Sequence, residues 1–222
     1  MCFSATASFT ASITLSAFGI ATIQKTSSKR ELLLSFCPLL FAIQQLIEGI
    51  IWLSFSHPSL NSLASVLAAS FLFFATLLWP IYCPLSAFLV EKSQFKRSLM
   101  FALTCIGLIF GTYLYSFVLN HGIYPQMHSG HILYDLTALP NYKVLTYCYL
   151  FVTSFSFLIS SNLFIQLFGL FTVISFWIAN RFYETTFVSV WCFFAAILSA
   201  WLYIVFASSK EISTKPSLLP NE

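Results

Sequence analysis

The chain has 222 residues, of which 59% are hydrophobic and only 8% charged, and its mean hydropathy is +0.86. Globular domains carry about 25% charged residues, so this composition excludes an ordinary soluble domain. The net charge of +3 does not indicate a nucleic-acid partner, because the basic residues lie in short gaps between apolar runs. These runs are about 20 residues long, the length that a membrane-spanning helix needs. We therefore expect an all-α, polytopic protein whose surroundings are the lipid bilayer.

Seven apolar runs predict a bundle of seven transmembrane helices. In chain order they are residues 5–24, 32–55, 62–90, 98–119, 144–160, 163–180 and 186–208. Pro80 and Pro84 in the third run predict a kink or break, because proline removes a backbone hydrogen bond. Residues 209–222 contain two prolines and mixed charge, which predicts a disordered cytoplasmic tail after a single helical domain of residues 1–208.

The basic residues are distributed unequally between the gaps, and this predicts the direction of each crossing. Only Lys143 and Arg181 lie in the gaps on one side of the predicted bundle. The other side holds the remaining eight: Lys25, Lys29, Arg30, Lys92, Lys96, Arg97, Lys210 and Lys215. Cytoplasmic ends of membrane helices collect Lys and Arg. The N-terminus is therefore expected outside the cell and the C-terminus in the cytoplasm.

Glu48 is the only acidic residue well inside a predicted span. Gln44, Glu48 and Trp52 follow one another at helical i, i+4, i+8 spacing, so they share one face. A charge in a span costs a few kcal/mol, and such residues usually face the bundle interior or a cavity. Glu48 is thus either a hydrogen-bonded structural residue or a functional one, and we expect it to meet His131 or the start of the last helix.

Two further residues on the predicted outer side carry chemistry. Cys192 lies in the last helix at about the depth of Glu48, with Ser189 one turn earlier on the same face. His131 lies in the loop of residues 120–143, whose apolar stretch around it predicts that the loop folds back onto the bundle mouth. A cysteine in a membrane helix is usually a small packing residue, and the histidines lack the spacing of a helical metal motif.

Four stretches together resemble a known family. The opening Met1-Cys2-Phe3-Ser4-Ala5, the segment Gln45-Leu46-Ile47-Glu48, Gly130-His131 with Tyr134, and Phe187-Val188-Ser189-Val190-Trp191-Cys192 are similar to motifs of small bacterial integral membrane proteins of undetermined function. The resemblance covers nearly the whole chain and implies a bacterial inner-membrane location. It singles out Cys2, Glu48, His131 and Cys192 as the site residues. Relatives can carry an acid where this chain has Thr186, and Glu184 could substitute for it.

Three hypotheses follow from these residues. In the first, Cys2, Glu48, His131 and Cys192 converge on a transition metal such as zinc, because thiolate, imidazole and carboxylate are its usual ligands. Glu48 and His131 would then act as catalytic groups in a membrane-embedded hydrolase of lipid or amide substrates. In the second, the protein is a transporter, channel or sensor that uses Glu48 to bind a proton or ion. In the third, it is a scaffold with a Cys2–Cys192 disulfide.

Overall fold

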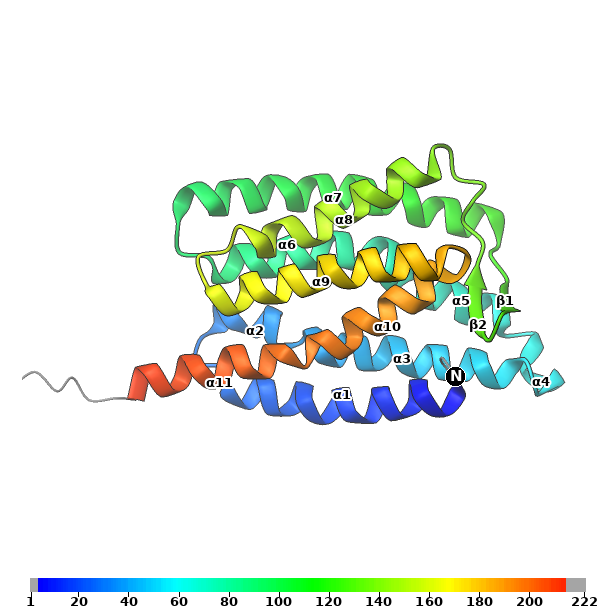
Figure 1. Cartoon of the computed structure of the whole chain (residues 1–222), viewed down its shortest axis with the longest axis horizontal. Helices are drawn as coiled ribbons and strands as arrows, with labels where there is room; N and C mark the ends of the chain where they lie inside the picture. The colour runs from blue at the N-terminus through cyan, green and yellow to red at the C-terminus, as the bar shows by residue number, and fades with distance from the viewer. Residues whose placement is uncertain (1–3, 215–222) are drawn as a thin grey trace, which may run out of the picture.

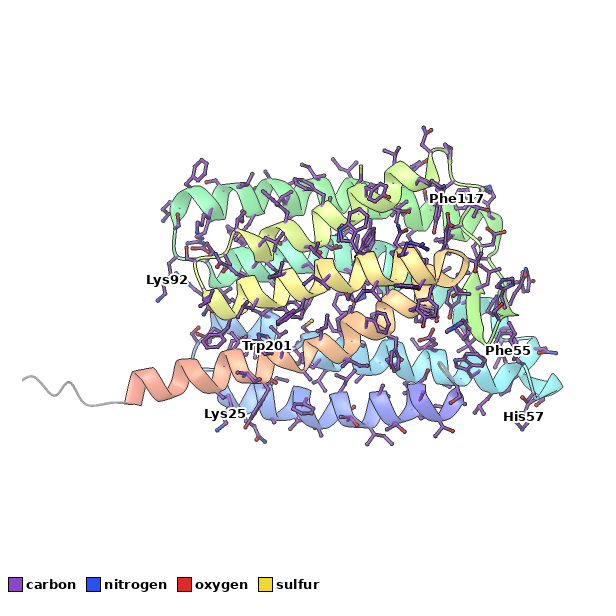
Figure 2. The ribbon with its side chains drawn as sticks, viewed as in Figure 1. Lys25, Phe55, His57, Lys92, Phe117 and Trp201 are labelled. Carbon is purple, nitrogen blue, oxygen red and sulfur yellow. The ribbon has the colours of Figure 1, made fainter. Side chains whose placement is uncertain are left out.

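The computed structural model describes residues 4–214 of the chain. Its long helices lie side by side along one axis, and a small β-hairpin covers one end of the bundle (Figure 1). We call this end the hairpin end. Lys25 and Lys92 lie at the opposite end, and Phe55, His57 and Phe117 lie at the hairpin end (Figure 2). We call the end with Lys25 and Lys92 the basic end.

The helices agree with the predicted apolar runs. They are α1 (Ala5–Lys25), α2 (Lys29–Ser35), α3 (Cys37–Ser54), α4 (Pro58–Asn61), α5 (Ala64–Leu72), η1 (Phe73–Leu78), α6 (Trp79–Val90), α7 (Gln94–His121), α8 (Tyr142–Leu158), α9 (Leu163–Phe182), η2 (Glu184–Thr186), α10 (Phe187–Ser199) and α11 (Trp201–Thr214). The last helix continues six residues past Ser208, where the tail was expected to begin. Lys210 and Glu211 are good helix formers, which accounts for the extension.

In the part of the chain that the structure describes, six helical segments are long and apolar enough to cross a membrane: residues 5–25, 29–54, 64–90, 94–121, 163–182 and 184–207. Much of their surface is apolar and faces outward. Ile13 of α1 and Ile109 of α7, for example, are 73% and 74% exposed. Large exposed apolar surface is tolerated where lipid covers it. The chain therefore has the architecture of an all-α membrane protein.

The predicted irregularity in the third span is a π-helix. Residues Phe73–Leu78 form η1 between α5 and α6, and Pro80 follows in the first turn of α6. Proline has no N–H to donate to the carbonyl four residues earlier, so the backbone widens just before it. π-Helical turns are rare and frequently lie at functional sites.

Helix α7 packs against this span through glycine. A Cβ atom on Gly107 would lie 1.9 Å from the carbonyl oxygen of Pro80, and one on Gly111 would lie 3.1 Å from the carbonyl oxygen of Thr76. Pro84 has no N–H to satisfy the Pro80 carbonyl. Glycine at position 107 therefore lets the α7 backbone approach the point where the third span is irregular.

The segment between α7 and α8 forms a β-hairpin instead of a loop. β1 (Pro125–His128) pairs antiparallel with β2 (His131–Tyr134). Ser129 and Gly130 form the turn, with φ angles of 50° and 79°, as two-residue hairpin turns require. Ile132 and Tyr134 are buried, so this segment folds back onto the bundle as predicted.

At the basic end, the buried carboxylate of Glu91 joins two connections. It accepts hydrogen bonds from the backbone N–H groups of Lys92 and Ser93, both at 2.8 Å, and from that of Ser161 at 2.7 Å. Burial alone would raise the pKa of Glu91, but these hydrogen bonds lower it below its ordinary value. Glu91 therefore holds the α8–α9 turn against the α6–α7 turn.

Candidate functional site

The carboxyl group of Glu48 lies inside the bundle, where it joins α3 to α10. It is 1% exposed. One oxygen accepts a hydrogen bond from Ser189 Oγ at 2.5 Å, and the other accepts one from Gln45 Nε2 at 3.1 Å. The expectation that Glu48 faces the interior and meets the start of the last membrane helix is therefore confirmed. We call Glu48 and its partners Ser189 and Gln45 the Glu48 centre.

A second polar contact lies beside this centre, on the side of the basic end. Trp79 Nε1 donates to Gln44 Oε1 at 2.9 Å, and the Trp79 ring stacks on Phe41 with 4.0 Å between ring centroids. Gln44 is fully buried, and its amide lies beside the Cys192 thiol. The Gln44–Glu48 face predicted from helical spacing thus points inward, but nothing in the sequence indicated Trp79 as a partner.

Tyr134 of β2 covers the centre from the hairpin end. It is 3% exposed, and its ring stacks on Phe71 of α5 with 4.8 Å between centroids. Burial raises the pKa of Tyr134, and the nearby Glu48 and Cys192 raise it further. The phenol therefore stays protonated and can donate a hydrogen bond.

Several buried polar atoms around Glu48 have no hydrogen-bond partner within the described residues. They belong to α1, α3 and β2 and comprise Ser8 Oγ, Gln45 Oε1, Trp52 Nε1 and Tyr134 OH. Ser8 belongs to α1, which packs on α3. In this contact the ring of Phe9 occupies the space that a side chain at Gly49 would need. Buried polar groups almost always find partners, either in the protein or in ordered water. This cluster can thus hold waters or a polar group of a ligand.

His131 lies beside the connection between α9 and α10, and its meeting with Glu48 stays a prediction. It is buried at the start of β2, and its ring packs against Tyr183 with 5.0 Å between centroids. Alternate residues of a strand face opposite sides, so His131 points away from the face that carries Ile132 and Tyr134. Burial lowers the pKa of His131, which favours a neutral imidazole.

The predicted metal site is not supported within residues 4–214. No three His, Cys, Asp or Glu side chains of the described residues lie close enough together to hold an ion. Glu48 and Cys192 are neighbours, and the ring of His131 packs against Tyr183. Cys2 lies outside the described residues. Cys192 is buried and carries a free thiol.

Three adjoining cavities lead from the hairpin end into the bundle. The mouth cavity, of about 270 Å³, is bordered by Lys143, Asn180 and Glu184, and Lys143 pairs with Glu184 at 3.6 Å. An upper apolar cavity of about 60 Å³ follows between η1, α8 and α10, and a lower apolar cavity of about 40 Å³ lies beyond it between α6, α8 and α9. Cys192 borders both apolar cavities, so the polar centre has an apolar approach.

Comparison with known families matches residues 1–217 to DUF6629, a family of unknown function. Comparison with curated proteins and with solved structures returns no match. The matched range includes the buried centre, the hairpin and all three cavities. The family assigns no activity, in agreement with the resemblance that the sequence motifs indicated. The chain belongs to the family of unknown function DUF6629.

Proposed function

We propose that the protein crosses a bacterial cytoplasmic membrane seven times, with the hairpin end outside. Helix α8 follows the hairpin, and the turn after it is bound to Glu91 at the basic end, so α8 runs the length of the bundle. Its 17 residues span about 26 Å at 1.5 Å per residue, close to the hydrocarbon thickness of about 30 Å. The eight basic residues on one side support a cytoplasmic basic end.

We further propose that Glu48 is a protonatable group of a transporter or sensor. The observation that carries this proposal is that both partners of the buried carboxyl group are uncharged. Among the side chains that the structure describes (residues 4–57 and 59–207), the one ion pair is the exposed Lys143–Glu184 pair, so no described basic side chain neutralises Glu48. An unpaired charge in a membrane interior is costly. Glu48 is therefore suited to hold a proton and to release it when a cation or a changed conformation compensates.

Infrared difference spectroscopy tests this role. The full-length protein, reconstituted in lipid, should show the C=O stretch of a protonated carboxyl group at neutral pH, and Glu48→Gln should remove that band. Glu184→Gln is the matched control, because Glu184 is exposed, and it should leave the band unchanged. A wild-type spectrum without a protonated carboxyl band at neutral pH would refute the proposal.

A membrane-embedded hydrolase is the second candidate, and the contact of both apolar cavities with Cys192 favours it. Glu48 would act as general base beside the Cys192 thiol. A zinc ion would be held by Cys2, Glu48 and Cys192, with His131 as the fourth candidate ligand. Metal analysis of the purified full-length chain distinguishes the two candidates: about one zinc per chain, lost in Cys192→Ser, would favour the hydrolase.

A further inference from the structure

The three cavities lie in a row, because neighbouring cavities share lining residues, and we call this row the approach. The mouth cavity and the upper apolar cavity share Tyr142, Thr146 and Phe187. The upper and lower apolar cavities share Tyr149, Trp191 and Cys192. A ligand that enters beside Lys143 and displaces the side chains shared by neighbouring cavities therefore passes along all three.

The walls of the two apolar cavities are hydrocarbon even where threonine lines them. The hydroxyl of Thr76 donates to Leu72 O at 2.8 Å, and that of Thr146 donates to Tyr142 O at 2.9 Å. In the lower cavity, Thr153 donates to Tyr149 O at 2.8 Å and Thr172 to Phe168 O at 2.9 Å. Each hydroxyl is thus occupied within its own helix. Water finds too few partners in such a space, and apolar cavities stay dry.

The length of this row of cavities fits part of one lipid chain, and its two apolar cavities are narrow. Phe187 borders the mouth cavity and Ala195 borders the lower cavity, and this stretch of α10 rises about 12 Å at 1.5 Å per residue. One leaflet of the hydrocarbon core is about 15 Å thick. A single water needs about 10–15 Å³ of cavity, so volumes of 60 and 40 Å³ give room for several methylene groups.

The π-helix opens the wall of the upper cavity. Ala75 and Thr76 of η1 line this cavity, opposite Val188 and Cys192 of α10. π-Helical turns are rare and are frequently found at functional sites. Its place in the cavity wall is an observation independent of the apolar lining.

We propose that this approach binds one hydrocarbon chain of an amphiphile from the outer leaflet. The polar head stays in the mouth cavity beside Lys143 and Asn180, and the chain runs past Tyr149 and Trp191 to the lower cavity. The chain then lies against Cys192, next to the Glu48 centre. The binding proposal rests on the cavities alone. That the bound amphiphile is the transported or sensed molecule rests on the proposed function.

Photocrosslinking with a fatty acid that carries a diazirine midway along its chain tests the inference. The full-length protein is reconstituted in lipid nanodiscs, illuminated, and mapped by mass spectrometry. We expect label on Leu145, Tyr149 and Val188, and we expect excess unmodified fatty acid to compete it away. Label confined to lipid-facing residues such as Phe151 and Ile174, or cavity label that does not compete, would overturn the proposal.

Cavity-filling variants supply the control. Ala75→Phe fills the upper cavity and should lower the competable label by roughly tenfold or more, because the added ring occupies the space of the chain. Ile109→Phe adds comparable bulk on the exposed face of α7 and should leave the label unchanged. If Ala75→Phe fails to fold, Leu145→Trp blocks the same cavity from α8. Unchanged label in a folded filling variant would contradict the proposal.

The infrared and crosslinking experiments test the role of Glu48 and the binding site separately, so either proposal can fail without the other. Competable cavity label without a protonated Glu48 band would leave the binding site standing and remove the proposed role of Glu48. A Glu48 band without cavity label would do the reverse.

Discussion

The carboxyl group of Glu48 has the surroundings of a residue that can change its protonation state within the membrane. Ser189 and Gln45 solvate it with uncharged donors, and Tyr134 adds a protonated phenol nearby. Donors of this kind stabilise a carboxylate without a counterion, whereas the apolar surroundings favour the neutral acid. The hydrogen bonds and the apolar surroundings oppose each other, so a ligand or a conformational change can shift Glu48 between its protonated and ionised forms.

Removal of the Ser189 hydroxyl should weaken the protein measurably. Ser189→Ala leaves one Glu48 oxygen without its donor, and we expect a loss of about 1 kcal/mol in the free energy of unfolding. Ser199→Ala is the matched control on the same helix, because Ser199 Oγ donates only to Ala196 O of its own helix. Chemical denaturation in detergent measures both. Equal losses would show that the Ser189–Glu48 hydrogen bond has no special weight.

Helical spacing was enough to predict that Glu48 lies inside the bundle, because a charged residue in a span has few other places to go. The partners were harder to predict. Trp79 bonds to Gln44 across 35 positions in the sequence, and such a pairing depends on the rotation of two helices about their axes. The contact of His131 with Tyr183 was likewise not predicted, because it depends on how the hairpin settles on the α9–α10 connection.

At the scale of elements, α7 and the third span are held together by a close backbone contact. Gly107→Ala should destabilise the protein by about 1–3 kcal/mol, because its Cβ would lie 1.9 Å from a backbone carbonyl oxygen. Gly111→Ala meets its nearest atom at 3.1 Å and should cost less. Unfolding in denaturant ranks the two variants, and an equal or greater loss for Gly111→Ala would contradict the packing described.

The Glu91 carboxylate that joins two turns at the basic end should make stability depend on pH in the acid range. The folded pKa of Glu91 is lowered, so its contribution is present above the ordinary glutamate value of about 4.3. That contribution is lost as the pH falls through the folded pKa. Glu91→Gln should remove this acid dependence, whereas Glu184→Gln should retain it. An identical pH profile for wild type and Glu91→Gln would contradict this account.

The apolar runs predicted where the helices are, because length and composition alone determine which segments can enter a bilayer. They could not predict the hairpin, since Pro125–Tyr134 is short and forms strands only through pairing of its two halves. The prolines predicted an irregularity in the third span. Its form as a π-helix over Phe73–Leu78 depends on how α7 packs against it.

At the scale of the molecule, the unequal charge of the two ends predicts a fixed orientation. A periplasmic reporter fused within the hairpin, after Gly130, should be active, and the same reporter fused after Thr214 should be inactive, because the basic end stays in the cytoplasm. A cytoplasmic reporter should give the opposite pattern. Activity of the periplasmic reporter after Thr214 would reverse the proposed topology.

A reactive carbodiimide measures the central claim, a protonated Glu48 in the apolar interior, most directly. Carbodiimides add to protonated carboxyl groups, and dicyclohexylcarbodiimide partitions into hydrocarbon. We predict that it modifies Glu48 at neutral pH in the lipid-reconstituted protein but not the exposed Glu184, which pairs with Lys143, and that a water-soluble carbodiimide does not modify Glu48. Mass spectrometry of peptides from the wild type and from Glu48→Gln locates the adduct. Modification of Glu48 by the water-soluble reagent alone, or by neither reagent, would contradict the account.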